Sequence, residues 1–140
     1  MNRNRAADIV VAYAADPAGR GLAYASLGTG TQTAVMRVPF EVTPLPLYNG
    51  REFGFAAVHA LLGELRRRGF GRIRLRLADE EVVRDLAGPH IVPPALAMPY
   101  VRARCSLNGF AAARVERADR REIADLEARA RAELQLRTAA

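Results

Sequence analysis

The residues best suited to chemistry are carboxylates that stand at the ends of predicted elements. Asp79 directly follows the alternating stretch "RIRLRLA" (72–78), and Glu52 lies in the first turn of a predicted helix. Carboxylates that are far apart in a sequence meet only if the fold brings strand ends and helix starts together, and both residues are so placed. Their oxygen atoms are the ligands that hard divalent cations such as Mg²⁺ prefer.

These two carboxylates have ordinary structural explanations, and so do Asp16 and Asp125, which are considered as further candidates below. Asp79 can cap the helix that follows it, a role that is compatible with metal binding. Glu52 can complement the helix dipole, and Asp125 can be one more solvated charge on a charged helix. The pair Asp16-Pro17 is more often a turn than a metal site. These alternatives stay open at the level of the sequence.

The hydrophobic pattern predicts a mixed α/β sheet that positions these residues. Strands are expected at 8–15, 21–28, 32–43, 72–78 and 110–116, and helices at 51–68, at 79–88, from about 99 to 108, and at 119–136. Asn49 is a candidate cap for the first helix. The first three strands are joined by short connections and should be antiparallel, whereas the later strands follow helical crossovers and should be parallel to their neighbours.

Composition favours one compact domain over residues 1–140. Half of the residues are hydrophobic, and the net charge is +6 with a pI of about 10.6. All 21 basic residues are arginines. Arg72, Arg74 and Arg76 alternate on one strand and, with residues 66–68, form a basic cluster that could contact a nucleic-acid backbone. A solvated or salt-bridged face is the alternative. Base-stacking aromatic residues are absent there, so backbone contacts are expected.

The sequence also suggests where the protein resides. Its one cysteine, Cys105, allows neither an intrachain disulfide nor a cysteine-based zinc cluster. We see no apolar run suited to a signal peptide or to a membrane span. We therefore expect a cytoplasmic protein with no membrane partner.

Three stretches resemble the small bacterial and archaeal ribonuclease HI-like proteins. They are "NGREFGFAAVHALLGELRRRG", "IRLRLADEEVVRDLAG" and "VERADRREIADLEARARAEL", which are similar to the family's first helix, its fourth strand with the following helix, and its last strand and helix. The resemblance covers nearly the whole chain. It implies a ribonuclease H-like fold, a five-stranded mixed sheet with helices on both faces.

The resemblance also implies a metal site. In the family, four carboxylates hold two divalent ions, Mg²⁺ or Mn²⁺, and the enzyme cuts the RNA strand of an RNA–DNA hybrid. Glu52, Asp79 and Asp125 match three of these carboxylates, and we expect them to converge within one metal-sized site. At Asp125 the match is looser, because Leu126 follows directly where the family has its leucine two residues later.

The first carboxylate departs from the family pattern. The family has Asp-Gly directly after the first strand, whereas this chain reads "AYAADPAGRG". The best strand register puts Ala14 or Ala15 at that position, and Asp16 follows. Either Asp16 serves from a shifted position as catalytic and metal-binding residue, or the site lacks its central ligand.

Two main functions follow from these observations. One is a metal-dependent ribonuclease H-like endonuclease, or a degenerate descendant of one, with Asp16, Glu52, Asp79 and Asp125 as its site. The alternative is a non-catalytic ribonuclease H-fold module that binds nucleic acid or protein. A third interpretation is a homodimer-forming domain that uses its last helix or an edge strand.

Overall fold

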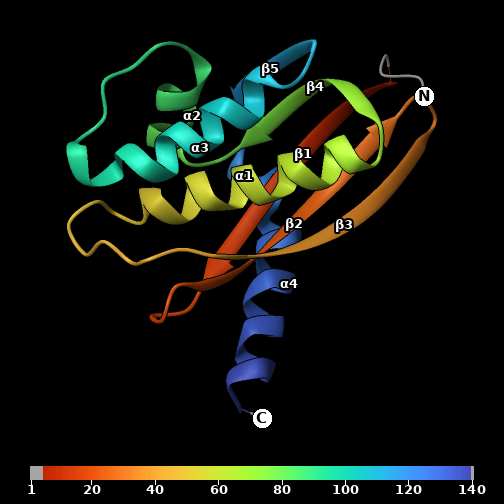
Figure 1. The fold of residues 1–140 in the computed structure, drawn as a ribbon. Helices are drawn as coiled ribbons and strands as arrows, with labels where there is room; N and C mark the ends of the chain where they lie inside the picture. Colours follow the sequence, from red (N-terminus) through yellow and green to blue (C-terminus); the bar gives the residue numbers. More distant parts are fainter. Residues whose placement is uncertain (1–4, 140) are drawn as a thin grey trace.

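A five-stranded mixed sheet forms the centre of the computed structural model, which describes residues 5–139 (Figure 1). Its strands are β1 (Arg5–Ala15), β2 (Arg20–Thr29), β3 (Gln32–Glu41), β4 (Phe70–Leu77) and β5 (Ala112–Arg117). The order across the sheet is β3-β2-β1-β4-β5. Strands β1, β2 and β3 pair antiparallel, while β4 and β5 join in parallel. This arrangement confirms the predicted mixed sheet.

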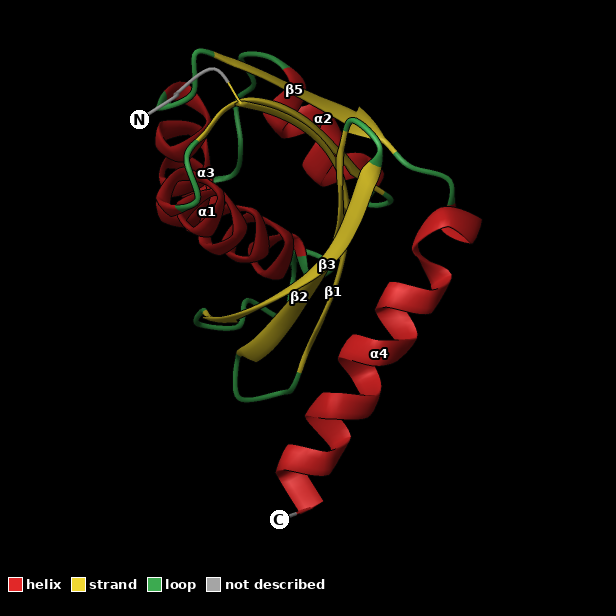
Figure 2. Ribbon diagram, turned by 90° about the vertical axis from the view of Figure 1, so that its right-hand side faces the viewer, coloured by secondary structure: helices red, strands yellow, loops and turns green. Residues whose placement is uncertain are grey.

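Helices cover both faces of the sheet. They are α1 (Arg51–Arg67), α2 (Glu80–Ala87), the 3₁₀ turn η1 (Pro94–Leu96), α3 (Ala97–Asn108) and α4 (Arg120–Ala139). Figure 2 shows α4 alone on one side of the sheet and α1 and α3 on the other. None of the helices in the described part of the chain is both long and apolar enough to span a membrane.

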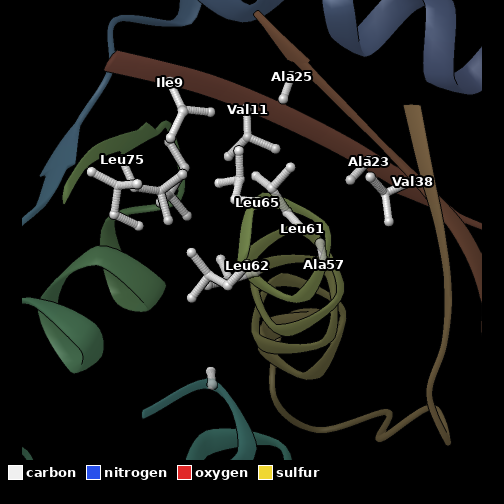
Figure 3. Close-up of a cluster of buried hydrophobic side chains, with 14 of the residues drawn as sticks. Ile9, Val11, Ala23, Ala25, Val38, Ala57, Leu61, Leu62, Leu65 and Leu75 are labelled. Atoms are coloured by element: carbon white, nitrogen blue, oxygen red, sulfur yellow. The ribbon is translucent and has the colours of Figure 1, made fainter. Parts of the chain in front are cut away.

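The main core lies between α1 and the sheet (Figure 3). The apolar residues of α1 recur every three or four positions, so Leu61, Leu62 and Leu65 share the face that meets the sheet and are fully buried. Ile9 and Val11 alternate along β1 and point to the same core. Each such side chain contributes about 1.5–3 kcal/mol on burial.

A thinner core joins α4 to the opposite face of the sheet. Ala12 packs with Ile123 and Leu126, and Leu22 packs further along the helix with Ala130 and the residues around it. The small side chains of Ala12 and Ala130 let the helix lie close to the strands. Tyr24 Oη also donates to Glu133 Oε1 at 2.6 Å. These contacts hold α4 along strands β1 and β2.

The start of α1 differs from the prediction. Asn49 was expected to cap the helix, but the capping position is Gly50, and no side chain bonds to the free amides there. Asn49 and Gly50 both have positive φ, 53° and 78°, a left-handed turn that Gly and Asn tolerate best. The chain therefore enters α1 through a backbone turn rather than through a side-chain cap.

Candidate functional site

Asp79 lies at the end of β4 and begins α2. Its Oδ1 accepts hydrogen bonds from Glu81 N at 3.0 Å and Val82 N at 3.2 Å, which confirms the predicted helix cap. Its Oδ2 accepts a hydrogen bond from Tyr13 Oη at 3.2 Å. Both carboxylate oxygens of Asp79 therefore already have partners within the chain.

Tyr13 is the residue that β1 presents to Asp79. Val10 on β1 is paired with Arg76 on β4, and three more residues on each parallel strand bring Tyr13 opposite Asp79. The sequence had placed Ala14 or Ala15 there. Ala14 instead faces the other side of the sheet, next to Leu22. The expected register was thus one or two residues too late.

The environment of Tyr13 keeps its hydroxyl neutral. Burial raises the pKa of Tyr13 far above its usual value, and the negative charge of Asp79 and the hydrogen bond to it raise this pKa further. The charges of Glu127 and Glu52 act in the same direction. A phenol that keeps its proton is a hydrogen-bond donor and not an anionic metal ligand.

Glu52 is buried but engaged elsewhere. Its side chain is 1% exposed, and Oε2 accepts a hydrogen bond from the backbone N–H of Leu45. Its Oε1 is buried without a hydrogen-bond partner in the described structure. Glu52 thus fastens the loop before α1 and does not line the pocket of Asp79, although its charge acts on Tyr13 there.

Asp16 closes the turn between β1 and β2. Its Oδ1 accepts hydrogen bonds from Ala18 N at 2.9 Å and Arg20 N at 3.1 Å. Because a strand advances about 3.3 Å per residue, Asp16 lies roughly 10 Å beyond Tyr13 along β1. It lines a different hollow, with Leu134 and Arg137 among its neighbours. The structure does not bring Asp16 to Asp79.

Asp125 points into solvent. Its side chain is 86% exposed and forms an ion pair with Arg129 at 3.6 Å. Successive helical residues are about 100° apart, so Ile123 and Glu127 share the face that turns towards Asp79, and Asp125 does not. The expected convergence of Glu52, Asp79 and Asp125 is therefore wrong, since no group of three or more potential ligands could hold a metal ion within residues 5–139.

The pocket around Asp79 has a mixed lining and a volume of about 380 Å³. Acidic, basic and neutral side chains contribute to it: Val11, Tyr13, Asn49, Ala78, Asp79, Glu80, Glu81, Arg117, Arg120, Ile123 and Glu127. Arg117 forms an ion pair with Glu80 at its rim. The four acids outnumber the two arginines, but both oxygens of Asp79 are bonded within the chain and Glu80 is paired with Arg117, so this donor set does not fit the pair of divalent ions that the resemblance implies.

A buried ion pair supports one wall of this pocket. Asp85 is fully buried in α2, and its Oδ2 lies 2.9 Å from Arg51 Nη1. Arg51 also contacts Glu81 at 3.1 Å, so it ties the start of α1 to the first turn of α2. Leaving one member of such a pair unpaired costs about 3–5 kcal/mol. The acidic rim is therefore held in place rather than free to rearrange.

Ion pairs also occupy part of the predicted arginine cluster. Arg74 Nη2 lies 2.7 Å from Glu116, and Arg76 Nη1 lies 2.6 Å from Glu122. Arg72 is exposed and forms no ion pair in the described structure. Of the three strand arginines, it is therefore the one whose charge is directed to solvent alone.

Several residues of this pocket escaped the sequence analysis. Tyr13 and Ile123 were overlooked because their side chains carry no charge that would suggest a site. Glu127 was one of many acids on α4, and only the packing of that helix identifies it. A signal did exist for Tyr13, because it is the one residue in "VVAYAA" with a polar group.

Comparison with known proteins supports the fold. No family model and no curated protein matches the chain. Among solved structures, RNase H1 from the halophilic archaeon Halobacterium salinarum is 22% identical with a TM-score of 0.68, covering 91% of this chain and 92% of that one. The N-terminal RNase H domain of a Mycobacterium tuberculosis protein is 16% identical with a TM-score of 0.65, covering 84% and 89%.

A third solved structure includes a nucleic acid. LC11-RNase H1 in complex with an RNA/DNA hybrid is 15% identical with a TM-score of 0.57, covering 89% of this chain and 90% of that chain. At such identities the likeness concerns the fold alone. This chain therefore has the ribonuclease H fold.

Proposed function

We propose that this protein is a ribonuclease H-fold module that binds nucleic acid, with an RNA–DNA hybrid as its ligand, and does not cleave it. The observation that carries this proposal is Tyr13, whose neutral hydroxyl lies beside Asp79 where metal-dependent cleavage would need a carboxylate. Of the other candidates, Asp16 and Asp125 are directed elsewhere, and Glu52 is bonded to the backbone of the loop before α1. The site therefore lacks the metal ligands that cleavage needs, whereas the fold and the basic net charge suit binding.

Binding is supported by charge and by the likeness in fold. The net charge of +6 favours a polyanionic ligand. One protein with this fold, LC11-RNase H1, has been solved in complex with an RNA/DNA hybrid. Arg72, an exposed arginine of β4 without an ion pair in the described structure, suits contacts with phosphates, because the guanidinium fork binds two oxygens at once. Such contacts are made to the backbone and carry no sequence preference.

The test compares binding and cleavage in one set of samples. Purified protein is incubated with a labelled RNA–DNA hybrid in Mg²⁺, in Mn²⁺ and in chelator. We expect a retarded complex and intact RNA in all three. Asp79→Asn serves as the matched variant, because Asn also caps helices and the fold should persist. With Asp79→Asn we also expect a retarded complex and intact RNA in all three conditions.

Two other outcomes would overturn the proposal. Cleavage that requires Mg²⁺ or Mn²⁺ and disappears in Asp79→Asn would establish the endonuclease instead. The shared pocket of Asp79 and Glu127 is the observation that favours that second candidate. Absence of binding to any nucleic acid would leave a protein-binding module. Cleavage that survives Asp79→Asn would indicate a contaminating nuclease, and the preparation would be repeated.

A gain-of-ligand experiment tests the geometric argument directly. Tyr13→Asp combined with Ile123→Asp places two further carboxylates beside Asp79. Close like charges destabilise this variant without metal, and we expect Mn²⁺ to raise its Tm much more than it raises the Tm of the natural protein. Tyr13→Asn with Ile123→Asn is the uncharged control. An equal response of the two double variants would contradict the assignment of these positions.

A further inference from the structure

We propose that the outer edge of β5 is a self-association surface, where β5 of a second copy of this chain pairs antiparallel and joins the two sheets. Strand β5 ends the sheet order, and no strand in the described structure lies beyond it (Figure 1). Unpaired edges are ready templates for another strand. The opposite edge, β3, differs because Pro39 removes one of its backbone donors.

The backbone of β5 presents a regular set of free hydrogen-bonding groups. In a parallel pair, alternate residues direct both backbone polar groups to the same neighbour. Ala118 N donates to Leu77 O at 2.9 Å, and this alternation, followed back through the paired residues, directs the groups of residues 112, 114 and 116 towards β4 as well. Ala111 N, which donates to Gly71 O at 2.8 Å, lies before the paired residues. Ala113, Val115 and Arg117 therefore present their N–H and C=O groups outward.

Space for an incoming strand is present along this edge. A groove of about 640 Å³ follows β5, and it is lined by the end of α2, the end of α3 and residues 110–116. Leu107 and Phe110 form part of its apolar base. Because residues 110–116 line this groove, an incoming strand can reach them there.

The charged residues of β5 favour a second copy of this chain as the partner, and they set the register of the paired strands. Outward groups must meet outward groups, so a symmetric antiparallel pair is centred on one residue between 113 and 117. Centring on Arg114 or on Glu116 puts that charged residue opposite its own copy. Only centring on Val115 puts Arg114 opposite Glu116 of the second copy, twice by symmetry. Centring on Ala113 leaves both charges opposite neutral residues, and centring on Arg117 brings two guanidiniums together. Opposite charges stabilise cross-strand pairs and like charges destabilise them.

Glu116 has capacity for this second partner. Its Oε2 is bonded to Arg74, whereas its Oε1 has only a 3.7 Å contact with Arg114 of the same strand. Arg114 is 78% exposed and can reorient at little cost. Val115 packs against the edge of the main core, so two copies of Val115 side by side would extend that core.

The experiment uses charge reversal and complementation, with mass measured by light scattering over a range of concentrations. The natural protein should dimerise as concentration rises. Arg114→Glu and Glu116→Arg should each be monomeric, because like charges then face each other twice. An equimolar mixture of these two variants should restore the dimer, since both cross-strand pairs become attractive. Arg102→Glu, an exposed position on α3, is the charge-matched control and should dimerise normally.

Hydrogen exchange supplies an independent measurement. The amides of Ala113 and Val115 should exchange rapidly in Arg114→Glu and become protected at high concentration of the natural protein. A natural protein that stays monomeric throughout would overturn the proposal. So would a dimer that persists in Arg114→Glu, or two folded monomeric variants that fail to associate when mixed.

Discussion

Tyr13 keeps its proton because ionisation would put a second negative charge beside Asp79 in a partly buried site. The hydroxyl and Asp79 Oδ2 form a stable donor–acceptor pair at 3.2 Å. Hydrogen bonds to a charged group contribute about 1.5–3 kcal/mol, more than those between neutral groups. A single uncharged residue thus satisfies Asp79 and occupies the place where another carboxylate would be needed.

The raised pKa of Tyr13 predicts a specific response to alkali. The unfolded chain begins to release this proton near pH 10, the usual tyrosine value, whereas the folded chain holds it. The stabilisation is therefore complete below about pH 10 and is lost as pH rises above it. Between about pH 10 and 11, the natural protein should lose about 1 kcal/mol more unfolding free energy than Tyr13→Phe, because half of the unfolded chains have already released this proton at pH 10.

Urea unfolding of both proteins at several pH values measures this difference. Tyr48→Phe removes a hydroxyl from the loop before α1 and is the matched control. At neutral pH, Tyr13→Phe should also be less stable by about 1–2 kcal/mol, because Asp79 loses a donor. Parallel stability curves for the natural protein and Tyr13→Phe across the alkaline range would refute the role given to burial and Asp79.

The role of single residues within their own element could be predicted from the sequence, but the alignment of β1 with β4 could not. Asp79 follows an alternating strand and precedes an acidic helical turn, so its capping role could be inferred from neighbouring residues. Strand β1 is a continuous apolar run, "DIVVAYAA", whose lack of alternation leaves its alignment with β4 undefined. For Asp125, the many alanines of α4 obscure its buried face, so the sequence did not show that this side chain is exposed.

Helix α1 is the element on which the main core depends. Its buried leucines contact strands from both halves of the sheet, and its first turn carries Glu52. The same helix packs against α3, where His59 Nδ1 lies 2.6 Å from Ser106 Oγ. Helix α1 therefore packs in the core through its leucines and holds the loop before it through Glu52. Helix α1 was predictable because its apolar residues recur at the spacing of a helix, and this spacing can be seen in the sequence alone.

Truncation of this core should be costly. Leu61 is fully buried, so Leu61→Ala removes apolar contacts and leaves a cavity. We expect a loss of about 2–5 kcal/mol in the free energy of unfolding, measured by urea or thermal denaturation. Leu136, 73% exposed on α4, is the matched control, and Leu136→Ala should change stability by less than about 0.5 kcal/mol. Similar losses in the two variants would contradict the division between core and surface.

For the whole molecule, net charge overstates the basic surface that a ligand meets. Many arginines are bound to nearby carboxylates, as Arg37 is to Glu133 and Arg76 is to Glu122. A charge that is already paired releases fewer counterions on binding, because its field is partly neutralised. The sequence showed the alternation of arginines but not their partners, which come from distant elements such as α4. A small number of arginines without a carboxylate partner should therefore make most of the contacts with phosphates.

This reasoning gives a prediction for the salt dependence of hybrid binding. The logarithm of the association constant should fall linearly with the logarithm of salt concentration, by about 0.9 per phosphate neutralised, under the rule for B-DNA. Arg72→Gln should reduce the steepness by about 0.9, since its charge is free within the described structure. Arg74→Gln should change it less, because Arg74 is bonded to Glu116 at 2.7 Å. Affinity that does not respond to salt, or an equal effect of the two substitutions, would show that these arginines do not bind the backbone as the structure suggests.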